Sequence, residues 1–427
     1  MSETSVPVRQ PAFAALRHSG ARIYLLSAAV TMTADAIEHV VSYWMMYQKF
    51  HSPELAGFAV ISHWVPFLLL SVWGGSLADR YDPRRIIQIG MLFFIVASLA
   101  WAVLFLTDSL TMWEACVILV IHGMSGVFWG AAEQLLIYDI VGPAQLQSGI
   151  RFLATSRTLG LLLGPAVGGF LMLQIGPAPT LFVNVLLYMP LTLWLWKAPY
   201  GPKFRKGPQP APRPSIRGLD DYRMAIIAVT GNRTMLYMTV LAGAASFFIG
   251  MGMQPQMPAF AAALGHGQDS LYYTVLFGSS AMGALAAGIG LEVRSFLKPN
   301  PRTAILLAIL YCCAVGGFSI STNFWLSVVL LIVAGFLNLS YAAMAQTLVQ
   351  LNAPPDMRGR VMGLYATSAF GLMAFSGVTV GLVGGAIGVH LALGLSAGVM
   401  FCVAVVLLGL YVRQRPAQAS PSTSAIE

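Results

Sequence analysis

Charged residues are scarce in this chain. Only 9% of its 427 residues are Asp, Glu, Lys or Arg, whereas a soluble globular protein has about 25%. Hydrophobic residues make up 57% of the chain, enough for about twelve spans of about 21 residues each. The composition therefore argues against a water-soluble enzyme and predicts one polytopic, all-α membrane domain with short loops.

Cysteines are also few, and their spacing matches neither a disulfide pattern nor a metal-binding motif. All lie inside apolar runs, at Cys116, Cys312, Cys313 and Cys402. We expect small buried side chains at these positions, and neither a disulfide framework nor a zinc site. A cleavable signal peptide is not expected either, because the first apolar run is long and contains acidic residues.

The apolar runs predict twelve transmembrane helices. They cover residues 23–47, 55–77, 86–106, 112–137, 149–173, 181–196, 235–259, 271–291, 304–321, 324–348, 361–383 and 389–412. The 42 glycines and 21 methionines suit close-packed, mobile helices.

An internal repeat relates the two halves of the chain. The triplet Ala-Thr-Ser at residues 154–156 and the Gly-rich run after it recur 212 residues later, at residues 366–368. The same offset carries the start of the first span onto the start of the seventh. Two six-helix halves of parallel topology are the simplest architecture, and one large class of transporters is built in this way.

The basic residues fix the expected orientation. When both termini are placed in the cytoplasm, Lys49 is the only one of the 24 Lys and Arg residues in an external loop. This asymmetry follows the positive-inside rule and explains the net charge of +8 without a nucleic-acid partner. The expected segments are a cytoplasmic N-terminal stretch, a six-helix bundle, a cytoplasmic basic linker, a second six-helix bundle and a cytoplasmic tail, at residues 1–22, 23–196, 197–234, 235–412 and 413–427.

The connection between the second and third spans carries a recognisable motif. Residues 75–85, GSLADRYDPRR, resemble the signature G-x-L-A-D-R-x-x-x-R-R of the major facilitator superfamily. The resemblance implies the twelve-helix transporter fold of that family and a cytoplasmic gate. The gate residues are Gly75, Asp79, Arg80, Arg84 and Arg85.

Two further segments are similar to exporters of this superfamily. In the fifth span, the pattern G-x-x-x-G-P-x-x-G-G resembles the antiporter motif of drug exporters, with Arg151 replacing an earlier glycine of that motif. Its residues are Gly160, Gly164, Pro165, Gly168 and Gly169. An ordinary tight helix pair is the alternative reading. After the tenth span, PDMRGRV at residues 355–361 is similar to a segment of bacterial exporters related to the enterobactin exporter.

The first span carries three ionisable residues in its interior: Asp35, Glu38 and His39. Their i, i+3, i+4 spacing puts them on one helix face, about 18 Å from the cytosolic end. A charged group in hydrocarbon costs about 2.5 kcal/mol or more, so such residues normally face a cavity and mark a transport pathway. We expect this cluster to bind substrate or protons.

Other ionisable residues lie in the second, fourth and fifth spans. His63, His122 and Glu133 offer partners for the cluster or further proton steps, and the alternative for the histidines is a hydrogen bond to a neighbouring helix. His122 stands where many proton antiporters have the arginine of R-x-x-Q-G. Arg157 has three expected roles: to pair with Glu133, to meet an anionic substrate, or to reach the lipid headgroups.

The second half offers neutral polar residues. They are Gln254, Gln256, Tyr272, Tyr273, Asn338 and Gln346. Pro255 and Pro258 are expected to break the seventh helix. We expect this half to fit the shape of a substrate, although amides and aromatic rings also join helices to one another.

These features favour a secondary active transporter. The leading hypothesis is a proton-coupled exporter of a small amphiphilic molecule, such as a drug, a siderophore or a lipid-like compound, working by alternating access. One alternative exports a divalent transition metal through Asp35 and His39, and ferroportin-type iron exporters are similar in having an Asp and a His in their first helix. A membrane enzyme or scaffold is an alternative from another class, but the chain has no HExxH motif and no phosphate-binding glycine loop.

The resemblance also sets expectations about setting and partners. It implies a monomer in the bacterial inner membrane, driven by the proton gradient and without a cofactor. The expected partners are a small-molecule substrate, protons and the lipid bilayer.

Overall fold

The protein is almost entirely helical in its computed structural model, which describes residues 14–204, 218–294, 299–354 and 357–413. The first half contains α1 (Ser19–Phe50), α2 (Pro53–Arg80), α3 (Pro83–Leu106), α4 (Met112–Val141), α5 (Leu146–Ile175) and α6 (Pro177–Lys197). The second half contains α7 (Gly218–Gly231), α8 (Arg233–Phe248), α9 (Met257–Ala263), α10 (Ser270–Arg294), α11 (Pro301–Ile320), α12 (Phe324–Asn352), α13 (Arg358–Ala366), α14 (Met373–Ser376), α15 (Val383–Ile387) and α16 (Val389–Arg413). No strand occurs within the described ranges, and the all-α prediction is confirmed.

Capping and turn residues set the helix boundaries. Three helices begin at an N-cap residue whose side chain accepts a hydrogen bond from a backbone N–H group of the first turn. These residues are Ser52 for α2, Asp82 for α3 and Asn323 for α12. Proline opens α2, α3, α6 and α11, where its missing N–H removes no helical hydrogen bond. Gly176, with φ 83°, makes the turn between α5 and α6 in a region of backbone space that favours glycine.

The described helices account for twelve passes through a membrane. Nine spans are long and apolar enough to cross one, and α8, which passes the same test only together with the bent helix α7, belongs to a tenth. The helix α1 is 32 residues long, but Asp35, Glu38 and His39 in its interior lower its hydropathy. With α1 and α10 added, the chain has the twelve spans expected from its apolar runs.

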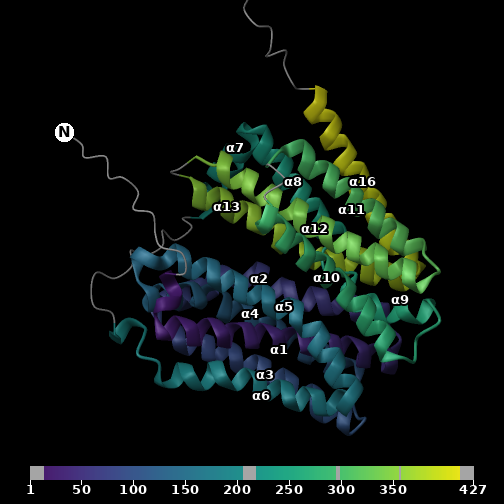
Figure 1. Ribbon diagram of the computed structural model, residues 1–427, viewed down its shortest axis with the longest axis horizontal. Coiled ribbons are helices and arrows are strands. Elements are labelled where there is room, and N and C mark those ends of the chain that lie inside the picture. Colours follow the sequence, from purple (N-terminus) through teal and green to yellow (C-terminus); the bar gives the residue numbers. More distant parts are fainter. Residues whose placement is uncertain (1–13, 205–217, 295–298, 355–356, 414–427) are drawn as a thin grey trace, which may run out of the picture.

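The helices form two groups that lie side by side (Figure 1). One contains α1 to α6, and the other contains α8 to α16. The same packing recurs in both groups: α2 packs on α4 as α10 packs on α12, and α3 packs on α6 as α11 packs on α16. The sequence repeat therefore corresponds to a repeat of tertiary packing, and the prediction of two six-helix halves is confirmed.

The two groups meet at one end of the molecule, which we call the α9 end (Figure 1). It comprises the last turns of α1, the first turns of α2, α9 and the first turns of α10. Three side-chain hydrogen bonds join the halves there, from Tyr273 Oη to the Val40 carbonyl oxygen (2.8 Å), from Gln256 Nε2 to that of Pro53 (2.8 Å) and from Gln48 Nε2 to that of Gly267 (2.6 Å). These contacts hold the halves together at this end.

Glycines bring the two halves into backbone contact near the α9 end. Gly57 of α2 lies against Gly377 and Gly381 of the eleventh span. A Cβ atom on Gly57 would stand 2.8 Å from the Gly381 Cα, closer than side chains tolerate. The close approach of these two spans therefore depends on the absence of side chains.

Two spans of the second half are irregular. The seventh is broken as predicted: α8 ends at Phe248, and the chain passes through a 3₁₀ turn containing Pro255 before α9 begins. The eleventh contains two π-helical stretches, Thr367–Gly371 and Gly377–Leu382. Part of the expected linker is helical, because α7 lies within it and meets α8 at an angle of 113°; residues 205–217 of that linker lie outside the described ranges.

Candidate functional site

The ionisable residues of α1 are buried inside the first half. Asp35 is 6% exposed and Glu38 is 2% exposed. The side chain of His39 is 14% exposed. Buried charges are tolerated only where they are paired or hydrogen-bonded, so the partners of these residues define what the site does.

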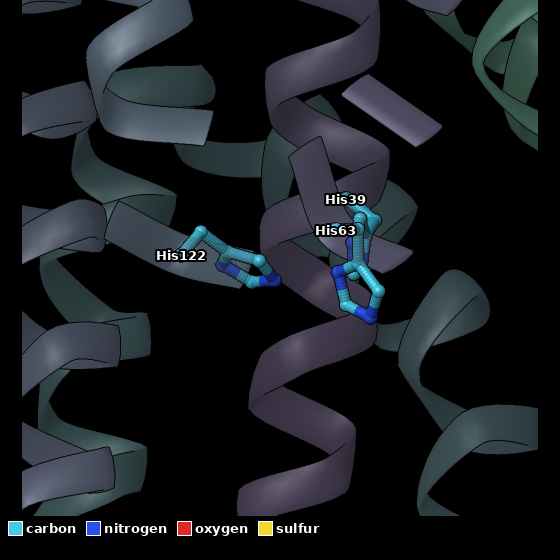
Figure 2. Close-up of side chains that lie close together, drawn as sticks. All are labelled: His39, His63 and His122. Atoms are coloured by element: carbon cyan, nitrogen blue, oxygen red, sulfur yellow. The ribbon is translucent and has the colours of Figure 1, made fainter. Parts of the chain in front are cut away.

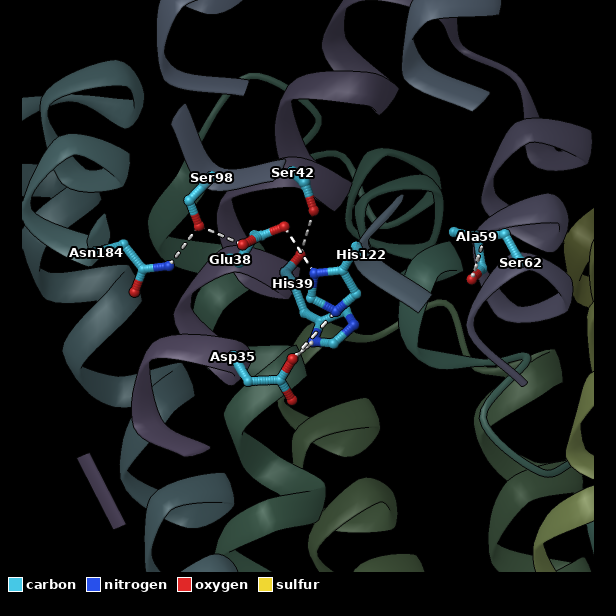
Figure 3. A network of polar contacts seen from close by, with 9 residues as sticks. All are labelled: Asp35, Glu38, His39, Ser42, Ala59, Ser62, Ser98, His122 and Asn184. Atoms are coloured by element: carbon cyan, nitrogen blue, oxygen red, sulfur yellow. Dashed lines mark hydrogen bonds and ion pairs between the residues drawn. The ribbon is translucent and has the colours of Figure 1, made fainter. Parts of the chain in front are cut away.

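Glu38 is the centre of a polar network that joins four helices (Figure 3). Its Oε1 lies 2.8 Å from Nδ1 of His122 on α4, and its Oε2 accepts a hydrogen bond from the Ser98 hydroxyl of α3. The Asn184 amide of α6 donates to the same hydroxyl over 3.0 Å. The carboxylate is thus held on both oxygens, which fixes its orientation inside the bundle.

Asp35 lies between two imidazole rings of the same cluster (Figure 3). Its Oδ1 is 3.1 Å from Nε2 of His122 and 3.8 Å from Nδ1 of His39. His122 therefore contacts both carboxylates, one through each ring nitrogen. This arrangement lets one imidazole link the charge states of two carboxylates.

His63 of α2 completes the cluster (Figure 2). Its ring centroid lies 5.3 Å from that of His39 and 5.4 Å from that of His122. Five of the predicted site residues, drawn from α1, α2 and α4, are therefore brought together. We call them the histidine–carboxylate cluster: Asp35, Glu38, His39, His63 and His122.

The glycines of α5 allow α1 to pack closely against it. A Cβ atom on Gly160 would meet Ala29 and Met32, one on Gly164 would meet Ala36, and one on Gly168 would meet Ile37. These contacts lie along α1 around Asp35. Gly169 instead faces Thr274 of α10, in the other half. The glycine pattern serves as a close-packing face for α1, and Pro165, also predicted in this motif, is buried within α5.

Glu133 and Arg157 form a separate ion pair in the same half. Arg157 Nη1 lies 2.5 Å from Glu133 Oε1, and its guanidinium stacks 5.6 Å from the centre of the Trp129 ring. Glu133 is 1% exposed on its side chain, whereas Arg157 is 42% exposed. Glu133 is eleven residues beyond His122 on α4, about 16 Å along the helix, so the pair is not part of the cluster.

The predicted gate motif is described in part. The surroundings of Gly75 and of the Asp79 side chain are outside what the structure describes, and Arg80 is exposed. Arg84 is buried, pairs with Asp82 at 2.6 Å and donates to the Ala198 carbonyl oxygen. Partial burial raises the pKa of Asp82, but hydrogen bonds from Arg84 and its positive charge outweigh that effect and hold the pKa below its usual range.

The remaining gate arginine and the polar residues of the second half have other contacts. Arg85 donates to Gln88 Oε1 over 2.6 Å. Gln256 and Tyr273 make the hydrogen bonds between the halves already described, while Tyr272 stacks on His266 with ring centroids 3.6 Å apart. Gln254 is half-buried, and Asn338 and Gln346 are exposed. The structure does not gather these residues into one group, and their role in a substrate cavity stays a prediction.

Sequence comparison agrees with this architecture. The profile of the Major Facilitator Superfamily matches residues 23–378 and 300–427, which together span most of the chain. The chain belongs to the major facilitator superfamily. It is therefore a transporter and not an enzyme.

Individual relatives are transporters of several kinds. The multidrug efflux pump Tap of Mycolicibacterium fortuitum is 24% identical over 400 residues, which cover 91% of this chain and 96% of that protein. The staphyloferrin A transporter of Staphylococcus aureus is 29% identical over 170 residues, 36% of this chain and 41% of that protein. This match and those to two further curated transporters span less than half of each relative.

A solved structure confirms the fold. The bacterial homologue of the human lysosomal transporter Spinster, in its inward-facing and unoccupied conformation, has a TM-score of 0.69 at 13% identity. The superposition covers 95% of this chain and 98% of that one. At this identity the likeness concerns the fold alone.

Two residues of the network were not predicted from the sequence. Ser98 and Asn184 support Glu38 from α3 and α6. Each is an isolated polar residue in an apolar span, which is the signal that was available. Serine and asparagine are common in membrane helices as contacts between helices, so only the tertiary structure shows that these two serve the site.

Proposed function

We propose that this transporter is a secondary active exporter that moves a small amphiphilic molecule out of the cell by alternating access. The observation that carries the proposal is the histidine–carboxylate cluster, which places two carboxylates and three imidazoles inside a membrane-spanning bundle. Such groups are expensive in a membrane and mark substrate or ion pathways. Similarity to a multidrug efflux pump over 91% of the chain supports export.

The proposed orientation follows from the distribution of basic residues. With both termini in the cytoplasm of a bacterium, the chain lies in the inner membrane and the α9 end faces outward. The hydrogen bonds between the halves at that end then form the outer closure. Export requires these contacts to break so that the site opens outward.

The proposed driving force is the proton gradient, with the histidine–carboxylate cluster as the coupling site. Asp35 and Glu38 both contact His122, so a change in charge on any of the three alters the environment of the other two. A change of this kind biases the inward-open or the outward-open state of the transporter. The carboxylates of α1 are thus the proposed link between proton movement and transport.

Reconstituted protein tests this function directly. Proteoliposomes that contain a pH-sensitive dye receive either a lipophilic organic cation or a hydroxycarboxylate siderophore. The wild type is expected to give solute-evoked proton flux, and Asp35→Asn is expected to reduce it to background because the charge that couples to His122 is lost. Asp269→Asn, an exposed acidic residue near the start of α10, is the matched control.

Two results would contradict the proposal. Full solute-evoked proton flux in Asp35→Asn would remove the cluster from the coupling mechanism. Solute movement that ignores the imposed pH gradient in the wild type would exclude the proton as the driving ion.

A further inference from the structure

The three histidines of the cluster turn their rings toward one another from three different helices (Figure 2). One ring nitrogen from each of His39, His63 and His122 lies within 4.8 Å of the others. Asp35 Oδ1 borders two of these rings. We propose that His39, His63, His122 and Asp35 form a binding site for a divalent transition-metal ion.

The ring of His63 has a buried nitrogen without a partner. Within the described residues, His63 Nδ1 is buried and makes no hydrogen bond, whereas His122 Nε2 and Asp35 Oδ1 lie 3.1 Å from each other as an ion pair. A buried polar atom left without a partner costs about 1–3 kcal/mol, so His63 Nδ1 requires an explanation. A metal ion bound among these three atoms would give His63 Nδ1 a partner and would take the place of the contact between His122 and Asp35.

The contact of His122 with Glu38 has the form expected of a metal ligand. Its Nδ1 lies 2.8 Å from the Glu38 carboxylate, and its Nε2 lies 3.1 Å from Asp35 Oδ1, another of the proposed ligand atoms. Metal-binding histidines almost always donate their second ring N–H to a carboxylate, which orients the ring and raises its basicity. Ser98 in turn fixes Glu38, so the orientation of His122 is set in advance.

The donor set indicates the class of metal. Three imidazole nitrogens and one carboxylate oxygen suit Zn²⁺, Ni²⁺, Co²⁺, Mn²⁺ or Fe²⁺, and the cluster contains no sulfur donor that would favour Cu⁺. Two nitrogens bound to one such ion are at most about 4.2 Å apart, so binding draws the rings closer by side-chain rotation. The carboxylates of Asp35 and Glu38 offset the charge of the ion.

This inference rests on the proposed function, because it names the class of solute for the same site. A metal ion held by α1, α2 and α4 lies inside the half of the transporter that carries the coupling residues. The exported amphiphilic solute would then be a small metal complex in which that ion keeps open coordination positions. An organic cation without a metal would not need the three histidines.

Metal binding is measurable on the purified full-length protein. The protein is prepared with an affinity tag that contains no histidine, is stripped with a chelator, and is titrated with Co²⁺ in detergent. The wild type is expected to bind one equivalent and to develop the visible absorption of Co²⁺ with nitrogen ligands. Zn²⁺ is expected to displace that absorption.

Single substitutions assign the ligands. His63→Gln and His122→Gln are expected to weaken Co²⁺ binding at least about tenfold, and Glu38→Gln by about 10- to 100-fold through the orientation of His122. His63 is the sharpest variant, because its Nδ1 has no hydrogen bond to lose among the described residues. His390→Gln, in the second half, is the matched control and should bind Co²⁺ as the wild type does.

The outcomes separate this inference from the proposed function. No stoichiometric Co²⁺ binding by the wild type, or equal binding by His63→Gln, overturns the metal site. If chelator-treated proteoliposomes still show proton flux evoked by an organic cation in the wild type and in His63→Gln, the metal inference fails while export stands. If Co²⁺ binds through the histidines but neither Co²⁺ nor an organic solute evokes proton flux, the site stands and proton-coupled export fails.

Discussion

At the scale of single residues, two kinds of buried charge occur in the first half. In the histidine–carboxylate cluster, both carboxylates and the central imidazole are at most 6% exposed. In the Glu133–Arg157 pair, only the carboxylate is buried. The consequences of removing one partner therefore differ between the two.

The Glu133–Arg157 pair should respond asymmetrically to substitution. Arg157→Gln leaves a buried carboxylate without its cation and is expected to destabilise the protein by roughly 3 kcal/mol. Glu133→Gln leaves a guanidinium that is 42% exposed and can be hydrated, so the expected cost is below about 1 kcal/mol. In thermal unfolding in detergent, the wild type should have the highest melting temperature, Glu133→Gln a slightly lower one and Arg157→Gln the lowest. A lower melting temperature for Glu133→Gln than for Arg157→Gln would refute this account.

At the scale of elements, glycine faces and helix caps position the site. The glycines of α5 hold α1 at close range around Asp35. The first turn of α3 is fixed by Asp82, which caps the helix and pairs with Arg84. Arg84 also reaches the Ala198 carbonyl oxygen after α6, so this one helix start fastens two elements together.

The pairing of Asp82 predicts a pH-dependent contribution to stability. Its folded-state pKa is lowered, so the stabilisation is fully present above the unfolded pKa of about 3.9 and is lost as the pH falls through the lower folded value. Asp82→Asn keeps a capping side chain but loses the charge. We expect the variant to melt below the wild type at pH 7, and the difference to shrink below about pH 4.

The control for this prediction is Asp108→Asn. Asp108 pairs with Lys49 but its side chain is 92% exposed, so its removal should change the melting temperature little at either pH. A difference between Asp82→Asn and the wild type that persists unchanged in acid would show that the ion pair with Arg84 does not stabilise this connection.

At the scale of the whole molecule, the two halves are joined at the α9 end by backbone contacts and hydrogen bonds. Gly57 packs against Gly377 and Gly381, and Tyr273 bonds to Val40 across the same boundary. Alternating access requires this end to open and to close again. The contact between Gly57 and the eleventh span must therefore be close when this end is shut, and no bulky side chain can stand between the two backbones.

A side chain at Gly57 should prevent closure of the α9 end. Gly57→Leu places atoms where the Gly377 and Gly381 backbones now lie, so we expect loss of transport and greater exposure of a cysteine introduced at Tyr273. The measurement is alkylation of that cysteine by a membrane-impermeant maleimide in intact cells. Gly316→Leu is the control, because no atom lies within 4 Å of a Cβ there; unchanged labelling in Gly57→Leu would contradict the prediction.

The sequence by itself determined the class of protein and most of its helices. Hydropathy and the positive-inside pattern depend on local composition, so they predict a polytopic membrane chain with boundaries within a few residues. The 212-residue repeat predicted two halves that pack alike. The spacing of Asp35, Glu38 and His39 put them on one helix face, because helical periodicity is a local property.

Only the tertiary structure decided which other residues join that face. His63 and His122 lie on α2 and α4, 24 and 83 residues from His39, and helix periodicity does not determine which helices become neighbours. The sequence offered Glu133 both as a partner for the cluster and as a partner for Arg157, and the packing of α4 decides for Arg157. The three histidines meet because they lie at the same height on three helices, α1, α2 and α4, that cross near one another. The spacing of residues along a single helix does not determine how helices cross.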